Sequence, residues 1–354
     1  MTAVHFVVPD GIDDPARPSG GNVYDRHLCR GLTSLGWLVQ EHPVPGSWPA
    51  RDATSLAALD GVIRGIPDDG VVLLDGLIAS TASEVLSPEA SRLRMVVLVH
   101  MALGHRPADG VADDVRGRER AMLSAATAVI TTSAWTRRRL LELYALPDDR
   151  VHVAEPGVQA ADLAPGSAAG AALLCVAAVS ADKGHDVLLD ALAGLTDLSW
   201  QCVCAGSLDR APAFVEELRR RCVAAGLNDR VSFPGPLTGA DLDRTYAAAD
   251  LMVLASRAEA YGMVISEALA RGLPIVATEV GGVTEALGQA DGARPGLLVP
   301  PDDPAALGAA LRAWLGDPGL RRRLRRAARE RRDSLPGWST TTSAIAGVLA
   351  GASR

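Results

Sequence analysis

Two carboxylates flank a glycine turn in the segment 256–287, which reads SRAEAYGMVISEALARGLPIVATEVGGVTEAL. Gly262 frees the backbone at the point where MVISEALA takes up helical spacing, so we expect a helix to begin there. The first turn of a helix presents free N–H groups and the positive end of its dipole, which suits a phosphate. Glu267, one turn further on, is placed to accept both hydroxyls of a ribose, and Glu259 can face the group beyond the phosphates. These residue types predict a nucleotide-binding site.

A single lysine, Lys183, stands among 34 arginines. Lysine offers a compact point charge on a flexible stem, whereas arginine offers a broad planar fork. Lys183 follows the apolar run LLCVAAV, and His100 ends the run RMVVLVH. Ligands of open α/β sheets bind outside the carboxyl ends of the strands. Both residues are therefore candidates for a binding site.

The glycine pair Gly20-Gly21 follows the first apolar run and precedes a helical stretch. Glycines let a backbone approach a phosphate closely, so this loop is a second candidate phosphate contact. A dinucleotide-binding site would need G-x-G-x-x-G at this position, and that motif is absent.

Apolar runs alternate with helical stretches along the whole chain. Because these runs are continuous rather than alternating, they indicate strands buried on both faces and hence parallel sheets covered by helices. The alternation repeats in two halves, which predicts an α/β protein with two doubly wound domains. The expected strands are 4–9, 71–77, 94–100, 128–133 and 151–158 in the first half, and 173–179, 200–206, 230–235, 250–256, 274–278 and 296–300 in the second.

The best candidate boundary is the stretch 159–169, QAADLAPGSAA, which has the composition of a linker. The predicted domains are 1–165 and 166–335, followed by a C-terminal helix in 336–354. The segment 321–332 carries eight arginines at helical spacing, and we interpret it as a solvated helix face.

Composition narrows the class of protein. The chain has 354 residues and a formal net charge of −7, which argues against non-specific nucleic-acid binding. No basic leader precedes the first apolar run, and no run approaches the roughly 18 apolar residues of a membrane span, so we expect a cytoplasmic protein. The five cysteines lack metal-ligand spacing and are expected to be reduced, buried thiols.

The segment 256–301 resembles the Glu-x7-Glu signature of the retaining, GT-B-fold glycosyltransferases of family 4 (glycosyl transferases group 1). The resemblance includes EAYG, ALARGLPIVAT, GGVTEAL and GLLVPPDD, and Lys183-Gly184 resembles a lysine-glycine pair of that family. It implies two Rossmann-like domains facing across a cleft. Residues 1–165 would form the acceptor-side domain, 166–335 the nucleotide-sugar donor domain, and the helix in 336–354 would cross back to the first domain.

The resemblance also implies roles for the candidate residues. The enzyme would move a sugar from a nucleoside diphosphate to an acceptor hydroxyl by front-face displacement, with retention of anomeric configuration. The implied catalytic residues are Lys183 on the diphosphate, Glu259 on the sugar and His100 near the anomeric carbon. The implied donor-binding residues are Gly20, Gly21, Gly262, Met263 and Val264 for phosphate, Glu267 for ribose, Gly206 and Leu237 for the base, and Arg257.

One position departs from the family pattern. The arginine usually found five residues before the lysine is replaced by Ala178. We expect Arg257 or Arg106 to supply the missing positive charge on the diphosphate. What replaces this arginine cannot be determined from the sequence.

No metal or cofactor is expected, because no carboxylate or histidine cluster has ligand spacing. The string Asp241-Leu242-Asp243 lies at an expected helix start, where acidic residues favour the helix dipole. The expected partners are a nucleotide-sugar donor and a small-molecule acceptor rather than a lipid, because residues 1–165 carry 15 basic and 21 acidic side chains, a balance of −6. The sequence leaves open the base, the sugar, the acceptor and the oligomeric state.

Two alternatives remain on the sequence alone. A GT-B-fold sugar-nucleotide epimerase would need further acid–base carboxylates and histidines in the first half, and the sequence pattern identifies none. A catalytically silent sugar-nucleotide binding protein is suggested by the missing arginine at Ala178.

Overall fold

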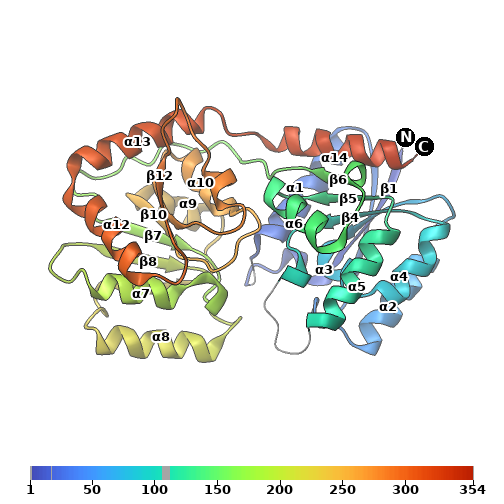
Figure 1. Ribbon diagram of the computed structural model, residues 1–354, viewed down its shortest axis with the longest axis horizontal. Helices are drawn as coiled ribbons and strands as arrows, with labels where there is room; N and C mark the ends of the chain where they lie inside the picture. The colour runs from blue at the N-terminus through green and yellow to red at the C-terminus, as the bar shows by residue number, and fades with distance from the viewer. Residues whose placement is uncertain (1, 17, 106–111, 354) are drawn as a thin grey trace. The chain divides into compact units, whose positions relative to one another are not determined.

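The computed structural model describes residues 2–16, 18–105 and 112–353 (Figure 1). The chain divides into two compact units. Unit 1 comprises Met1–Asp14, Gly21–Gly157 and Trp338–Arg354, and unit 2 comprises Pro15–Gly20 and Val158–Gly337. Arg106, one of the two proposed substitutes for the missing arginine, lies outside the described residues.

Unit 1 is built on a parallel sheet of six strands in the order β2-β1-β3-β4-β5-β6. The strands are β1 Ala3–Pro9, β2 Leu38–Val44, β3 Val71–Asp75, β4 Arg94–Val99, β5 Ala128–Thr131 and β6 Val151–Val153. The helices are α1 Gly20–Ser34, α2 Ala53–Arg64, α3 Gly76–Ala79, α4 Ser83–Leu86, α5 Ala112–Ala125, α6 Ala134–Tyr144 and α14 Trp338–Ala352, with short 3-10 helices at Asp10–Asp13, Ser87–Ser91, Leu103–His105 and Asp148–Arg150.

Unit 2 repeats this architecture with six parallel strands in the order β12-β11-β10-β7-β8-β9. The strands are β7 Ala172–Val176, β8 Gln201–Ala205, β9 Val231–Gly235, β10 Leu251–Leu254, β11 Ile275–Thr278 and β12 Gly296–Val299. The helices are α7 His185–Ala193, α8 Pro212–Ala224, α9 Gly239–Ala248, α10 Met263–Ala270, α11 Val283–Leu287, α12 Pro304–Gly316 and α13 Pro318–Arg332, with a 3-10 helix at Ala181–Lys183.

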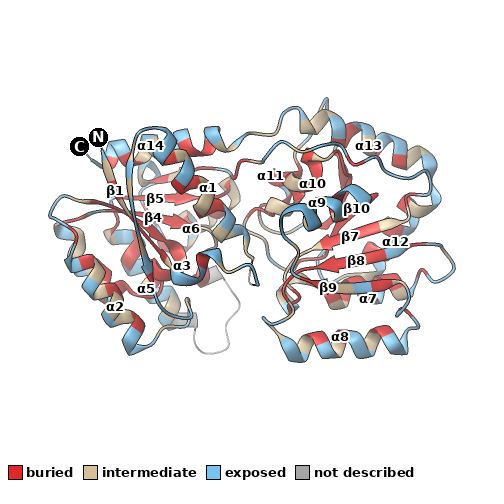
Figure 2. Ribbon diagram, turned by 180° about the vertical axis from the view of Figure 1, so that it is seen from behind, coloured by how far each residue is buried: buried red, intermediate tan, exposed pale blue. Residues whose placement is uncertain are grey.

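The strands of unit 2 are buried on both faces because successive side chains enter different cores. Leu251 and Val253 of β10 pack in a cluster with α7, α8 and α12, whereas Met252 and Leu254 pack in a cluster with α9, α10 and α11. Figure 2 shows the sheets of both units as mostly buried. This two-sided burial is why the strands read as continuous apolar runs.

All eleven strands expected from the sequence are present, and the prediction of doubly wound parallel sheets is confirmed. The twelfth strand, β2, was not expected. Its sequence LVQEHPV is interrupted by the polar run Gln40-Glu41-His42, and its residues are mostly exposed. β2 lies at the edge of its sheet, so it need not carry the apolar signal that identified the others.

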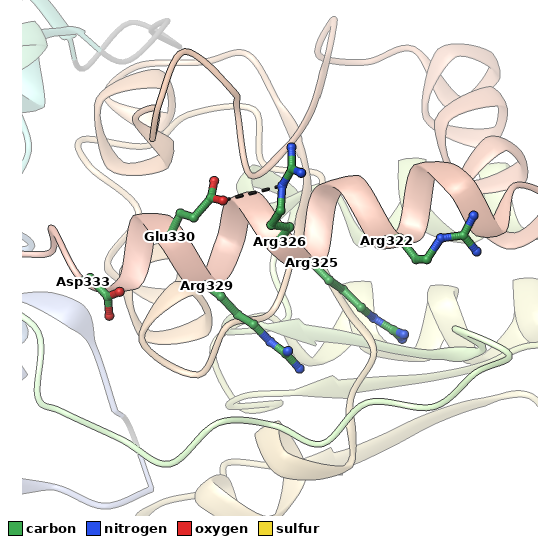
Figure 3. Close-up of a pocket in the computed structure, with 6 residues that line it drawn as sticks. All are labelled: Arg322, Arg325, Arg326, Arg329, Glu330 and Asp333. Atoms are coloured by element: carbon green, nitrogen blue, oxygen red, sulfur yellow. Dashed lines mark ion pairs between the residues drawn. The ribbon is translucent and has the colours of Figure 1, made fainter.

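The arginine-rich helix α13 does more than face solvent. Arg321 is buried and donates to the carbonyls of Trp314, Leu315 and Ala168, and Arg325 donates to Ser167 and pairs with Asp250. These arginines hold the irregular stretch around Ser167 and Ala168 against the rest of unit 2. The exposed arginines are Arg322, Arg323, Arg326 and Arg329, and Figure 3 shows three of them with Arg325, Glu330 and Asp333 around an open hollow of about 380 Å³.

Helix α14 completes unit 1. Its Trp338 stacks on His27 of α1 with ring centroids 4.3 Å apart, and it meets the Tyr24 ring edge-on. Thr341 donates a 2.7 Å hydrogen bond to the Glu155 carbonyl. The last helix of the chain is thus part of the first unit's core. Among the described residues, no helix combines the length and hydropathy needed to cross a membrane.

Candidate functional site

Lys183 and Glu259 form an ion pair in unit 2. The Lys183 Nζ lies 2.7 Å from Glu259 Oε1, and the Ser256 hydroxyl donates to the same oxygen at 2.7 Å. Lys183 follows β7 and Glu259 follows β10, and these strands are neighbours in the sheet. The sheet order therefore joins two residues that are 76 positions apart. An ammonium carries three donors, so the bond to Glu259 leaves two N–H groups for a ligand.

Glycines allow the loop that carries Lys183 and the loop that carries Glu259 to pack against their neighbours without steric clash. Gly184 has φ +65°, and a Cβ there would lie 1.9 Å from the Ala255 carbonyl oxygen. Gly281 has φ +55°, and a Cβ would lie 1.7 Å from the Glu259 carbonyl oxygen. Gly282 donates its amide to that carbonyl at 3.1 Å. The GGV turn noted in the sequence is thus a support for the Glu259 loop.

Arg257 ties the same two loops together. Its guanidinium pairs with both oxygens of Asp186 at 2.8–2.9 Å and with Asp302 at 2.6 Å, and it also contacts the Ala181 carbonyl. The hydrogen bonds that Arg257 donates to Asp186 and Asp302 raise its pKa, although burial acts in the opposite direction. A direct bond from Arg257 to a diphosphate would compete with two carboxylates, and its compensating role stays a prediction.

Helix α10 begins as expected from the sequence. Gly262 has φ +93° and is the N-cap, and Met263 and Val264 are half-buried in the first turn. Gly20, which belongs to unit 2, lies beside Met263, because a Cβ on Gly20 would be 3.3 Å from the Met263 sulfur. The structure therefore brings one glycine of the N-terminal pair to the start of α10.

Glu267 is half-buried in α10. The Tyr246 hydroxyl on α9 donates to Glu267 Oε2 at 2.9 Å, and Arg271 donates to the Glu267 backbone carbonyl at 3.0 Å. Burial raises the pKa of Glu267 above its ordinary value, and the Tyr246 hydrogen bond and the Arg271 charge act in the opposite direction.

The two residues proposed for the base are placed differently. Gly206 directly follows β8 and is buried, with its would-be Cβ 1.9 Å from the Ala177 carbonyl oxygen and its amide donating to the Gly235 carbonyl at 2.9 Å. Leu237 is half-buried and lines a hollow of about 520 Å³ beside α9, β8 and β9. Gly206 does not line that hollow, so the structure does not bring the pair to one pocket.

In unit 1, His100 meets two buried carboxylates. Its Nε2 lies 2.8 Å from Asp25 Oδ1 and 3.7 Å from Asp75 Oδ2. Asp25 comes from α1, Asp75 ends β3 and His100 follows β4. Gly21 closes the group, because a Cβ there would lie 3.3 Å from the His100 ring.

These carboxylates change how the cluster titrates. Burial disfavours the charged imidazole, but Asp25 and Asp75 outweigh it and raise the pKa of His100. Burial, followed by repulsion from Asp25, raises the pKa of Asp75 to about 7.

Asp25, Asp75 and His100 each place one possible ligand atom within 4.8 Å of the others. Carboxylate oxygens and imidazole nitrogens are atoms that bind metal ions. Unit 2 presents no group of this kind among the described residues. The Asp241–Asp243 string is not one, because Asp241 pairs with Arg244 and Asp243 with Arg271. The absence of a metal requirement stays a prediction.

Sequence reasoning missed Asp25, Asp75, Tyr246 and Ser256. Asp75 ends a strand, and that signal was available, as it was for His100. Tyr246 and Ser256 carry no sequence signal, since only the packing of α9 and the β10 loop brings their hydroxyls to the two glutamates. The five cysteines are all free and buried, as predicted.

Comparison with known proteins gives three kinds of finding. A model of the family "Glycosyl transferases group 1" matches residues 169–331. A D-inositol 3-phosphate glycosyltransferase from Salinispora tropica is 30% identical over 356 residues, covering 92% of this chain and 72% of that protein. The chain spans only 52–61% of the length of the first three curated relatives that it matches.

Two of the similar solved structures cover 99% of the chain at low identity. Sucrose-phosphate synthase from Thermosynechococcus elongatus has a TM-score of 0.81 at 23% identity over 99% of both chains. Anabaena HepE in complex with UDP-glucose has a TM-score of 0.80 at 18% identity, covering 99% of this chain and 100% of that one. These likenesses establish the fold as the GT-B architecture of two Rossmann-like domains. By the match to the relative from Salinispora tropica and to the family model, the chain belongs to the glycosyl transferases group 1.

Proposed function

We propose that this protein transfers a sugar from a nucleoside-diphosphate sugar to a hydroxyl of a small polar acceptor, with retention of anomeric configuration and without a metal. The observation that carries the proposal is the unit 2 constellation of Lys183, Glu259 and the glycine-led start of α10. Family membership supports the reaction class, and the UDP-glucose bound to Anabaena HepE supports a nucleotide-sugar donor.

In this proposal the protein supplies charge and positioning. Breaking the bond between the anomeric carbon and the diphosphate oxygen leaves negative charge, which preorganised donors stabilise. Lys183 has two remaining N–H donors for that charge, and the first amides of α10, at Met263 and Val264, add to them. Gly20 lets the backbone come close to the same helix start.

The new bond forms between the acceptor oxygen and the anomeric carbon on the face that the diphosphate leaves. The acceptor proton passes to the departing phosphate oxygen, so no separate general base is needed. Glu259, held by Ser256, binds sugar hydroxyls and stabilises positive charge at the anomeric carbon. His100 is proposed to donate to a sugar oxygen, a role that its raised pKa favours. Gly21 lies beside its ring.

For the acceptor we propose a small phosphorylated polyol. The curated relative from Salinispora tropica is named for D-inositol 3-phosphate, so this compound is the first to test.

The first test is donor binding. Thermal unfolding of the full chain is measured with UDP-glucose, UDP-N-acetylglucosamine, GDP-mannose and ADP-glucose, because a ligand that binds only the folded state raises apparent stability. The donor that binds is then incubated with D-inositol 3-phosphate in EDTA, and the product is identified by mass and its anomeric configuration by NMR. We expect transfer with retention in EDTA.

Variants then separate the roles of the two glutamates. Glu267→Ala is expected to weaken donor affinity about tenfold or more with a smaller change in kcat, because it removes hydrogen bonds to a charged acceptor. Glu259→Ala is expected to lower kcat about a hundredfold. The exposed Glu216, paired with Arg219 on α8, provides a control in Glu216→Ala, which should change neither value.

Each alternative has its own outcome. A panel in which no nucleotide sugar binds contradicts the proposal. Donor binding without transfer to any acceptor would indicate a binding protein. Release of free nucleoside diphosphate without acceptor would favour an epimerase, and the Asp25–Asp75–His100 cluster shows that unit 1 does hold carboxylates and a histidine.

A further inference from the structure

Tyr246 is held in a fixed position against Glu267. The tyrosine is fully buried, and its hydroxyl lies 2.9 Å from Glu267 Oε2. The Arg271 guanidinium covers the tyrosine ring at 4.4 Å, pairs with Asp243 and donates to the Glu267 carbonyl. The hydroxyl therefore cannot turn away from the carboxylate without disturbing α9 and α10 together.

The hydrogen bond from Tyr246 occupies one oxygen of the Glu267 carboxylate. Oε2 accepts from Tyr246, whereas Oε1 has no side-chain or backbone partner in the described part of the chain. A carboxylate that must accept two neighbouring hydroxyls needs a defined plane as well as a defined place. A donor behind one oxygen sets that plane.

We infer that Tyr246 is a positioning residue for the nucleotide ribose, because it orients the Glu267 carboxylate to accept the 2′- and 3′-hydroxyls. This rests on the proposed function, in which Glu267 contacts the ribose. Tyr246 itself does not touch the ligand, so its effect must disappear when the ribose hydroxyls are removed.

The charges around Glu267 come from three elements. Tyr246 and Asp243 lie on α9 and Arg271 is the C-cap of α10, and all three influence the pKa of the carboxyl. The Cys175 thiol on β7 is close enough to Tyr246 to add to its raised pKa, which is set first by burial and then by Glu267. Because the pKa of Tyr246 is raised well above its ordinary value, the hydroxyl remains a donor across the working pH range.

The test compares a nucleoside diphosphate with its 2′,3′-dideoxy analogue. UDP is the first probe, with GDP and ADP as replacements if the wild type binds one of those instead. Calorimetry with Tyr246→Phe, which keeps the ring and removes only the hydroxyl, is expected to show a five- to twentyfold loss of affinity for UDP. The same variant should bind 2′,3′-dideoxy-UDP within twofold of the wild type.

A matched control removes an equivalent tyrosine–glutamate hydrogen bond in unit 1. Tyr144 on α6 donates its hydroxyl to the buried Glu119 in unit 1. Tyr144→Phe should leave the affinity for both nucleotides unchanged, which separates positioning from a general loss of stability. In a Glu267→Ala background, Tyr246→Phe should cost no further affinity, because the carboxylate that it orients is gone.

The pH dependence gives a second readout. The Tyr246 hydrogen bond lowers the pKa of Glu267 against burial, so losing it should raise that pKa further. If binding needs the ionised carboxylate, the affinity for UDP should fall as the pH is lowered from 8 to 5. This fall should begin at a higher pH in Tyr246→Phe than in the wild type. Glu267→Gln should abolish this dependence.

The outcomes separate the two proposals. If the wild type binds no nucleoside diphosphate, the proposed function fails. If Glu267→Ala weakens UDP binding but Tyr246→Phe binds UDP as the wild type does, this inference alone is overturned. An equal loss for UDP and the dideoxy analogue overturns it as well, because the tyrosine would then act on the fold and not on the ribose contact.

Discussion

At the residue scale, burial raises the pKa of two carboxyl groups in this protein. Glu267 and Asp75 are carboxyls whose pKa is raised chiefly by loss of water, yet each is given a specific partner. Glu267 receives a tyrosine hydroxyl, and Asp75 accepts the Leu77 amide as the N-cap of α3. Such groups concentrate at functional sites because catalysis needs protonation states that water would not favour.

Asp75 makes a pH dependence of stability predictable. Its folded pKa of about 7 exceeds the ordinary value of 3.8, so the folded state holds the proton more tightly than the unfolded chain. Its contribution is fully present below about pH 4 and is lost as the pH rises through about 7. The raised pKa of His100 acts in the same direction above its ordinary value of 6.5.

Asp75→Asn should therefore reduce the loss of stability between pH 5 and 8.5, by about 1–3 kcal/mol. Asparagine keeps the helix cap. Hydrogen exchange of peptides from β3 and β4 in the full chain reports the change in unit 1. The exposed Asp149 gives the control Asp149→Asn. A wild-type and variant pair with the same pH profile would contradict the assignment.

At the element scale, the site depends on glycines that let loops touch. The Glu259 loop, the turn at Gly281 and the turn at Gly184 follow neighbouring strands, and they pack backbone on backbone. A side chain at either glycine has no space. Glycine is therefore required where loops from neighbouring strands of the sheet meet, and the requirement does not come from the conformation of one loop alone.

Gly281→Ala tests this packing. The added methyl group would lie 1.7 Å from the Glu259 carbonyl oxygen, so the loop must move. We expect kcat to fall at least tenfold and the free energy of unfolding to drop by about 2 kcal/mol. Gly292 also has a positive φ, +76°, but nothing lies within 4 Å of its would-be Cβ. Gly292→Ala should show only the backbone cost, about 1 kcal/mol, with unchanged kcat; equal kinetic effects would rule out the steric explanation.

At the scale of the whole molecule, the chain returns to its first unit after completing the second. α14 packs against β4 and β5, although more than 200 residues separate them in sequence. The anchor is Trp338, which stacks on the His27 ring and meets the Tyr24 ring edge-on. Unit 1 is thus completed by a helix that follows unit 2 in the sequence.

Trp338→Ala should destabilise unit 1 by about 2 kcal/mol, because it removes an aromatic stack and apolar burial. The change should appear as faster hydrogen exchange in α1 and the β4 peptides, with unit 2 unaffected. Ser339→Ala, at an exposed neighbouring position, serves as the control. Protection of α1 that does not change in Trp338→Ala would show that the helix contributes little to unit 1.

The sequence by itself determined the strands, the parallel sheets and the family. Continuous apolar runs mark strands that are buried on both faces, and the signature around Glu259 and Glu267 is local in the chain. The apolar pattern did not predict β2, because an edge strand that is exposed to solvent needs no continuous apolar run. Lys183 was found by its rarity, and His100 by its place at a strand end.

Only the tertiary structure decided which groups meet. The 2.7 Å contact of Lys183 with Glu259, the Tyr246 hydroxyl on Glu267 and the two carboxylates on His100 all join residues between 21 and 76 positions apart. The physical reason is that strand order in a parallel sheet is not sequence order. Residues at the ends of adjacent strands become neighbours through crossovers whose lengths carry no information about the side chains that they bring together.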